Sequence, residues 1–299
     1  MNMDEYWKKN YRVGKFGIKY LDEHLNGISK NDLIIIGSRS GAGKTSIATR
    51  IFNVNNQNIK CKLFLLENFD GDLYSNNVFI KYRKYSNQDI TQRQWLMNDF
   101  KVDYEALSKA EKEVKDSMNE KYIITRQPDY TIKKLKDDMI KAVEEDGCEL
   151  LIIDHLDYVD KDNPTENDIS HITDLMKTIR RLQDTYNVAV VAISHLRKPD
   201  HAKIPVKIPN ENEFIGSSNK VKEATVVIMF APDDEGNLKL NDPYHRRTWC
   251  CIRKNRFGGI DGRCANLVYD TKMQCYSDVY EVHSVNYLGT ETCLLGGEK

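Results

Sequence analysis

Residues 33–46, LIIIGSRSGAGKTS, place four apolar residues before a run of small residues and a Lys-Thr pair. The backbone N–H groups of such a loop can surround phosphate oxygens only where the side chains are small. Lys44 supplies a charge for the terminal phosphates, and Thr45 supplies a hydroxyl for magnesium. The stretch therefore predicts a nucleotide-binding loop with Mg²⁺. Its expected cofactor-binding residues are Ser38, Arg39, Ser40, Gly41, Ala42, Gly43, Lys44, Thr45 and Ser46.

The first position of this loop departs from the common phosphate-loop pattern. G-x-x-x-x-G-K-[ST] would place glycine at position 38, whereas the chain has Ser38 there and Gly37 one step earlier. A chance glycine-rich turn is the alternative. The apolar run before the loop and the helix pattern after it favour the phosphate loop.

Polar residues that end three other apolar runs could complete the chemistry. Asp154 ends LLIID, and its carboxylate could hold the magnesium shell through water. Glu67 ends LFLLE, and it becomes a candidate general base if the strands are parallel, because their carboxyl ends then share one edge. His195 ends another strand, where it could sense the terminal phosphate. The alternatives are a solvated glutamate and a histidine that caps a strand.

The elements that must position these groups alternate along the chain. Short apolar runs predict buried strands, and segments of helical period between them predict helices that begin near Thr131 and near Glu166. This alternation predicts an α/β fold with a mostly parallel sheet flanked by helices. The expected strands of this sheet are residues 33–36, 62–66, 121–125, 149–154 and 187–194.

Three regions differ from this alternation. Residues 68–116 are polar and aromatic and predict inserted helices, whereas residues 196–214 predict a long loop. Three later runs predict strands joined as antiparallel hairpins, with turns at DDEGN and FGGIDG, and residues 290–299 predict a loose tail. The three strands are residues 223–231, 246–254 and 264–270.

Composition narrows the class of protein. The chain has 299 residues and a formal net charge of −1, so nucleic acid could bind only to a local basic patch. No apolar run approaches the roughly 18 residues of a membrane span, and the N-terminus lacks the apolar core of a secretory signal. Seven cysteines without a C-x-x-C pair predict neither a disulfide framework nor a zinc site. We therefore expect a cytoplasmic protein.

Taken together, these motifs resemble the DnaB-type replicative helicases. GSRSGAGKT, LLENF, LLIIDHLDYV, VAISHLRKP and CIRKNRFGG occur in that family's order and spacing, from about Gly14 to Asp278. The resemblance is strongest to the helicase half of phage primase-helicases and to mitochondrial Twinkle. It implies a hexameric ring ATPase with a RecA-like P-loop NTPase core. The family's loop also carries a small residue other than glycine at its first position, which accounts for Ser38.

The resemblance also implies roles for individual residues. Glu67 takes the place of the catalytic glutamate, His195 that of the phosphate sensor, and Lys254 and Arg256 those of the pair inserted into the neighbouring subunit's ATP site. Tyr269 could stack on the base. Lys44 and Thr45 keep the roles already assigned, and Asp154 is the second acidic residue at the metal.

The resemblance implies that two loops line a central channel, one after the strand that ends at His195 and one around a Gly-Ser segment, so Gly216 and the basic residues of these loops are the candidate DNA contacts. Such residues would neutralise phosphates without regard to sequence. Interspersed acidic residues support the alternative of an ordinary solvated surface. The candidates are Arg197, Lys198, Lys203, Lys207, Gly216, Lys220 and Lys222, and the acidic residues among them are Asp200, Glu211, Glu213 and Glu223.

We expect residues 1–13 to form an arm that packs on another subunit, residues 14–285 the ATPase domain, and residues 286–299 a tail.

The expected function is ATP-driven translocation of a homo-oligomeric ring on single-stranded DNA, five-prime to three-prime, with a primase, polymerase or loader as further partners. Two alternatives stay open: a RecA/RadA-like recombination ATPase, and a KaiC-like ATPase that acts on protein partners without nucleic acid. A small-molecule kinase is disfavoured, because neither an arginine-bearing lid nor a substrate pocket is evident.

Overall fold

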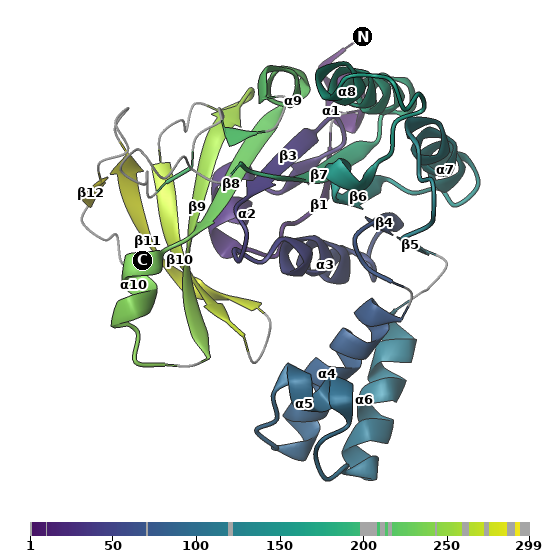
Figure 1. Ribbon diagram of the computed structural model, residues 1–299. Coiled ribbons are helices and arrows are strands. Elements are labelled where there is room, and N and C mark those ends of the chain that lie inside the picture. The colour runs from purple at the N-terminus through teal and green to yellow at the C-terminus, as the bar shows by residue number, and fades with distance from the viewer. Residues whose placement is uncertain are drawn as a thin grey trace.

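A wide, mixed β-sheet with helices on both faces forms the body of the protein, and a group of helices projects from one side (Figure 1). The computed structural model describes residues 2–9, 11–69, 71–118, 122–197, 208–209, 213–214, 217–242, 244–258, 263–271, 275–285 and 291–293. Among these residues, ten strands form the main sheet in the order β12-β11-β10-β9-β8-β3-β7-β6-β4-β5.

The sheet has a parallel half and an antiparallel half. The neighbours from β5 to β8 pair in parallel, and those from β8 to β12 pair antiparallel. The parallel strands are β3 (Leu33–Ser38), β4 (Cys61–Leu65), β5 (Ile123–Thr125), β6 (Leu150–Asp154), β7 (Ala189–His195) and β8 (Val226–Pro232). The others are β9 (His245–Asn255), β10 (Arg263–Asp270), β11 (Cys275–Val285) and β12 (Glu291–Cys293). The predicted α/β class, with antiparallel C-terminal hairpins, is confirmed.

Two apolar cores lie on the two faces of the sheet, because the buried strands are apolar on both sides. One face packs against α2 (Lys19–Leu25) and α3 (Lys44–Asn55), and the other against α7 (Ile132–Glu144), α8 (Asp168–Tyr186) and α9 (Ser217–Glu223). The remaining elements are α1 (Met3–Lys9), α10 (Asp234–Lys239), the 3₁₀ turn η2 (Leu156–Tyr158), and the small pair β1 (Arg12–Gly14) and β2 (Ile28–Ser29).

The predicted helix starts follow from capping. The Thr131 hydroxyl accepts a hydrogen bond from the N–H of Lys134, so α7 begins where its sequence indicates. The α8 helix begins two residues later than predicted. Asn167 is its cap, and the Asn167 side chain accepts from the N–H of Ser170 at 2.9 Å. In the part of the chain that is described, no helix is long and apolar enough to cross a membrane.

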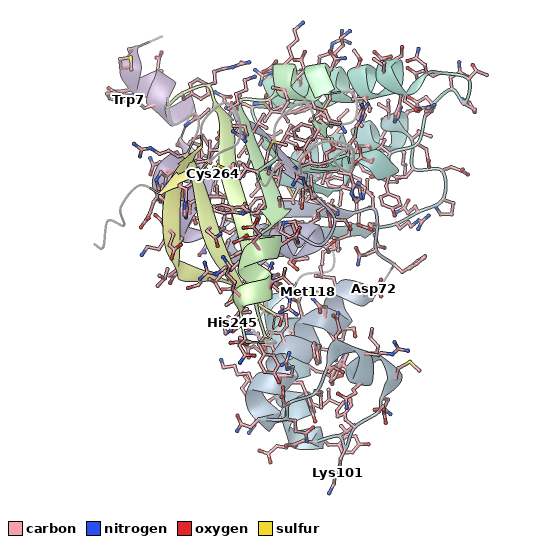
Figure 2. The ribbon with its side chains drawn as sticks, turned by 60° about the vertical axis from the view of Figure 1, so that its left-hand side comes forward. Trp7, Asp72, Lys101, Met118, His245 and Cys264 are labelled. Carbon is pink, nitrogen blue, oxygen red and sulfur yellow. A yellow bond between two sulfur atoms is a disulfide. The ribbon has the colours of Figure 1, made fainter. Side chains whose placement is uncertain are left out.

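The predicted helical insertion between two strands is present as α4 (Asp72–Ser86), α5 (Gln92–Met97) and α6 (Tyr104–Ser117). It has its own apolar core, in which Phe79 and Tyr82 of α4 pack against Trp95 and Ala110. Figure 2 shows Asp72 and Met118 where the projection joins the body and Lys101 at its far end.

Three sequence predictions need correction. DDEGN, predicted as a turn, forms the cap and the first four residues of α10, because the Asp233 carboxylate accepts from the N–H of Gly236 and caps the helix. The predicted tail contains β12, which pairs with β11. No disulfide was expected, yet Cys251 and Cys264 lie opposite each other on β9 and β10 and form one. The rest of FGGIDG after Gly258, and most of the predicted loop 196–214, lie outside the described residues.

Candidate nucleotide-binding site

The carboxyl ends of the parallel strands bring the predicted catalytic groups to one edge of the sheet. Ser38 at the end of β3 pairs with His195 at the end of β7, and Leu65 of β4 pairs with Asp154 of β6. Glu67 follows β4 by two residues and therefore emerges at the same edge. The structure thus brings together the end of β3, Glu67, Asp154 and His195, as parallel pairing requires.

Packing around the end of β3 explains why glycine stands at position 37 rather than at 38. Ser38 still belongs to the strand and needs no unusual backbone conformation. A Cβ atom at Gly37, however, would lie 2.6 Å from the ring of Phe214 and 2.8 Å from Leu196. The turn itself uses Gly41 and Gly43, whose φ angles of 83° and 78° suit glycine. The α3 helix then begins at Lys44.

Arg39 lies within the predicted loop, but its side chain bonds to protein. Its guanidinium donates to both carboxylate oxygens of Glu213, at 2.9 and 2.8 Å, and both side chains are largely buried. In the sequence, Glu213 is only one of the acidic residues interspersed among the candidate DNA contacts. The pair instead connects the phosphate loop to Glu213, near the end of the predicted long loop.

Asp154 is the best candidate ligand for a metal shell. It is fully buried, and neither carboxylate oxygen has a hydrogen-bond partner among the described residues. Burial raises the pKa of Asp154 to about 6, although the Thr45 hydroxyl nearby lowers it without reaching the geometry of a hydrogen bond. A buried carboxylate without partners, beside a hydroxyl and a glycine turn, fits Mg²⁺ with its waters. When bound, Mg²⁺ would neutralise charge on the phosphates of ATP.

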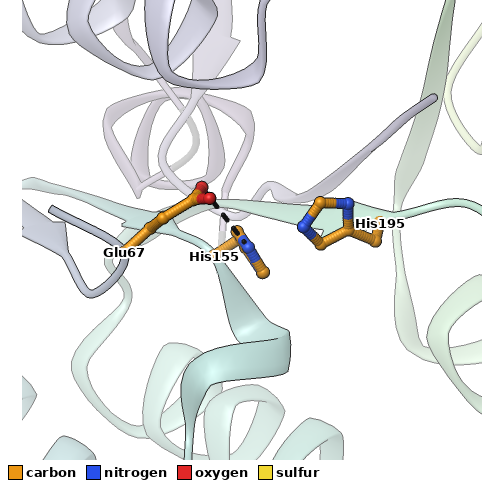
Figure 3. A group of neighbouring side chains, drawn as sticks. All are labelled: Glu67, His155 and His195. Carbon is orange, nitrogen blue, oxygen red and sulfur yellow. Dashed lines mark ion pairs between the residues drawn. The ribbon is translucent and has the colours of Figure 1, made fainter. Parts of the chain in front are cut away.

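Glu67 faces two histidines (Figure 3). Its Oε2 atom lies 3.6 Å from Nε2 of His155, and the rings of His155 and His195 lie 4.1 Å apart, edge to face. Burial lowers the pKa of His195, with a smaller effect of the same sign from His155 and Lys44, so its neutral form is favoured. His155 was not predicted as a site residue. Its position directly after Asp154 was the available signal.

Behind these histidines lies a charge network centred on Asp157, whose side chain is 20% exposed. Its carboxylate accepts from the backbone N–H of His195 at 2.8 Å and from Lys220 at 3.0 Å, and Lys220 also donates to the Ser194 hydroxyl at 2.7 Å. Burial acts to raise the pKa of Asp157, but contacts with His155, Lys220 and the His195 N–H hold it well below its ordinary value.

The prediction that Lys220 contacts DNA is therefore corrected. The residue is fully buried, and its ammonium is used within the protein. The other predicted DNA residues divide into two groups. Arg197 and Lys222 are exposed, whereas Lys198, Lys203, Lys207 and Gly216 lie outside the described residues.

Lys254 and Arg256 lie at the opposite end of the sheet from the phosphate loop. Asn255 pairs with Val226 at the start of β8, whereas Phe230 at its far end pairs with Ser38. Four residues of strand separate these points, about 13 Å. The Lys254 ammonium donates to the carbonyls of Val221 and Lys222 in α9. Arg256 is exposed at this remote end, away from the ATP site of its own chain.

Tyr269 on β10 lies beside the first turn of α3. Burial raises the pKa of its phenol, and the Ser46 hydroxyl lowers it, which places the two groups in contact. One side of the Tyr269 ring packs on Tyr276, with centroids 4.9 Å apart. The position next to Ser46 is compatible with the predicted stacking on a base, which stays a prediction.

Known proteins with related sequences are replicative helicases. A model of the DnaB-like helicase C terminal domain family matches residues 15–278. A probable replicative DNA helicase from Trieres chinensis is 24% identical over 255 residues, which cover 82% of this chain and 53% of the relative. The replicative DNA helicase DnaB from Rickettsia prowazekii is 22% identical and covers 76% and 47%. The chain thus spans about half the length of the curated relatives it matches.

Solved structures share the fold. One solved ATPase domain superposes with a TM-score of 0.74 at 15% identity, covering 93% of this chain and 95% of that one. A DnaB-like replicative helicase, described with its interactions with primase, gives 0.71 at 16% identity and covers 89% and 62%. A KaiC-like protein from Pyrococcus horikoshii gives 0.54 at 15% identity and covers 86% and 94%. The fold is therefore RecA-like, and the family match favours the helicase over the alternatives.

Proposed function

We propose that this chain is the motor of a ring-shaped DNA helicase. The chain belongs to the family of DnaB-like helicase C-terminal domains. The motor hydrolyses ATP and moves along single-stranded DNA, in the five-prime to three-prime direction that the family resemblance implies. The observation that carries the proposal is the meeting of the β3 loop, Glu67, Asp154 and His195 at one edge of the sheet.

Each group at this edge has a distinct task in the proposed reaction. Lys44 and the N–H groups around Gly41 and Gly43 bind the phosphates, and Thr45 and Asp154 hold Mg²⁺. Glu67 is one-third exposed, close to water, and accepts the proton of the attacking water molecule. His195, in its neutral form, donates its one ring N–H to an oxygen of the terminal phosphate group.

A second copy of the chain completes the site in this proposal. Arg256 is exposed and follows the end of β9, about 13 Å along the strands from the phosphate-loop edge. It can therefore stabilise charge on a phosphate only in a neighbouring subunit. An arginine supplied in this way contributes roughly 10³–10⁵ in rate. The proposed assembly is therefore a closed homo-oligomer with an ATP site at each interface, for which a hexamer is the family's arrangement.

The proposed DNA contact uses the exposed Arg197 and Lys222, which flank the segment containing the other predicted basic residues. Arg197 follows His195 by two residues, and Lys222 follows the buried Lys220 by two. Arg197 is thus two residues from His195 at the ATP site, and Lys222 is two residues from Lys220, which contacts Asp157, the acceptor of the His195 N–H. A primase, polymerase or loader is proposed as a further partner on the family resemblance alone.

The test is steady-state ATP hydrolysis with and without single-stranded DNA, at two salt concentrations. We expect DNA to stimulate hydrolysis, and salt to reduce the stimulation because phosphate contacts release counterions. Hydrolysis that DNA does not affect would support a partner-controlled, KaiC-like ATPase instead. Electron microscopy on DNA then separates a closed ring from the extended filament of a recombination ATPase.

A further inference from the structure

We propose that Glu67, His155 and His195 form a binding site for a transition-metal ion of the Zn²⁺ type, separate from the Mg²⁺ position at Thr45 and Asp154. One ligand atom from each of the three residues lies within 4.8 Å of the other two. Figure 3 shows the three side chains directed toward a common space. Two imidazoles and one carboxylate are the ligand set of several catalytic zinc sites.

His155 provides independent support for a ligand in this space. Its side chain is only 2% exposed, yet its Nε2 atom has no hydrogen-bond partner among the described residues. Buried polar atoms are nearly always satisfied, and an exception is explained by a catalytic role, strain, or a bound water or ion. The nearest charged atom to this nitrogen is Oε2 of Glu67, at 3.6 Å. A cation between the two atoms satisfies both.

The other nitrogen of His155 is arranged as metal-binding histidines require. Its Nδ1 atom lies 3.2 Å from Oδ2 of Asp157, whose charge Lys220 stabilises from the other side. Histidines that bind a metal commonly donate their second N–H to a carboxylate, which leaves the other nitrogen free for the metal. Nδ1 also lies 3.3 Å from the N–H of Asp157, but the carboxylate is the charged and therefore stronger partner for a protonated Nδ1.

Ligand chemistry selects the class of metal. Imidazole suits Zn²⁺, Co²⁺ and Ni²⁺, whereas Mg²⁺ prefers an octahedral set of oxygens. Tetrahedral Zn²⁺ with bonds of about 2.0–2.1 Å sets its ligands about 3.3 Å apart. The site is wider than this, and Glu67, whose side chain is 37% exposed, has the freedom to close it. Three protein ligands leave the fourth position for water or a phosphate oxygen.

Occupancy of this site would hold the protein in an inactive state. The metal would engage the carboxylate of Glu67 and the ring of His195, the two groups proposed to activate water and contact the terminal phosphate. This consequence rests on the proposed function, whereas metal binding itself does not. Micromolar Zn²⁺ would then inhibit hydrolysis without displacing Mg²⁺ from Asp154.

The test uses the full, nucleotide-free chain and Co²⁺ as the probe, because tetrahedral Co²⁺ has strong visible absorption. We expect one equivalent of Co²⁺ to give this spectrum and Zn²⁺ to abolish it. His155→Gln should weaken binding by more than about tenfold, since even the loss of an outer carboxylate costs 10–100-fold. His24→Gln is the matched control, because His24 lies on α2 and its Nδ1 contacts the Tyr20 carbonyl; its titration should match the wild type.

His195→Asn serves as the second variant, because His195 is only half-buried and its replacement disturbs packing less than that of His155. Circular dichroism checks that both variants are folded. Co²⁺ that binds folded His155→Gln and His195→Asn as it binds the wild type, or binds the wild type without tetrahedral absorption, overturns the proposal. A chain that binds Co²⁺ as expected but does not hydrolyse ATP would contradict the proposed function and leave the metal site standing.

Discussion

The ammonium of Lys220 lies 3.0 Å from Oδ1 of Asp157, in a place where the lysine is fully buried. The pair joins α9 to the turn after β6, and the same carboxylate accepts the N–H of His195. An ion pair between a buried lysine and a partly exposed aspartate thus connects the helix beside the predicted DNA loop to the strand end that faces ATP. Movement of α9 would therefore disturb the backbone at His195.

Removing the lysine should destabilise the fold. In Lys220→Met the carboxylate of Asp157, whose side chain is 20% exposed, keeps its charge but loses the Lys220 ammonium, which should cost less than the roughly 3–5 kcal/mol of a fully buried pair. The matched control is Lys222→Met, two residues along the same helix and exposed, which should change the free energy of unfolding by less than about 0.5 kcal/mol. Urea unfolding measures both.

Equal stability of these two variants would show that the pair contributes nothing. The double variant Lys220→Met/Asp157→Asn removes both charges and should recover part of the loss, because no uncompensated charge remains. Failure to recover would assign the loss to packing of the lysine chain rather than to the ion pair.

The position of the nucleotide site could be predicted from the sequence because it depends on local patterns. Each apolar run ends in its functional residue, and parallel pairing of such strands brings those ends to one edge. Glu67, Asp154 and His195 therefore meet as predicted. The sequence shows that position 37 is glycine, but it does not show why a side chain is excluded there. The ring that excludes it belongs to Phe214, which lies far along the chain.

The features that were missed depend on contacts between distant segments. Lys220 looked like a DNA contact because charge alone suggested solvent, whereas its partner Asp157 lies 63 residues away in sequence. The disulfide between Cys251 and Cys264 depends on the register of β9 and β10, which composition does not encode. The cap at Asp233 was a local signal for α10 and could have been recognised.

Asp154 should make stability depend on pH in a direction opposite to that of most carboxylates. Its folded pKa of about 6 exceeds the unfolded value of about 3.9, so the folded state binds more protons between these values. Stability without Mg²⁺ should therefore fall as pH rises from about 4 to about 6, by at most about 1.4 kcal/mol per pH unit. Unfolding by urea across this range should show the fall in the wild type and a smaller one in Asp154→Asn. Parallel profiles would contradict the raised pKa.

Variants of Lys44 and Glu67 should have different effects on ATP binding and on ATP hydrolysis. Lys44→Ala removes the charge that meets the terminal phosphates, so it should weaken ATP binding and abolish hydrolysis. Glu67→Gln keeps the shape of the side chain but removes the base, so it should bind ATP normally and lose at least about 10² in rate. Nucleotide binding by a fluorescent ATP analogue and phosphate release measure the two effects. Unchanged turnover in Glu67→Gln would remove it as the base.

Arg197 and Lys222 should contribute to binding of single-stranded DNA. Replacing either by alanine should weaken binding at all sequences and reduce the slope of log affinity against log salt by about 0.7, the value for one phosphate contact on a single strand. Lys109→Ala is the control, because Lys109 is an exposed lysine on α6 in the projecting helices. Fluorescence anisotropy over a salt series measures the slope. Equal effects of all three changes would indicate a general charge effect rather than a DNA site.

Arg256 should act in a neighbouring subunit. Its strand position lies about 13 Å from the phosphate-loop edge of its own chain. Arg256→Ala should therefore assemble and bind ATP but lose most of its hydrolysis. Mixing it with Lys44→Ala should restore activity, because some interfaces then combine an intact Lys44 from one subunit with an intact Arg256 from the next.

The matched control is a mixture of Lys44→Ala and Glu67→Gln. Both changes damage the same half of an interface, so every interface in that mixture has a defective phosphate-loop edge and no activity should return. Subunits are mixed over a range of ratios before assembly, and hydrolysis is measured with single-stranded DNA present. Recovery in both mixtures would point to subunit exchange or partial activity, and recovery in neither would place Arg256 outside the ATP site of the neighbouring subunit.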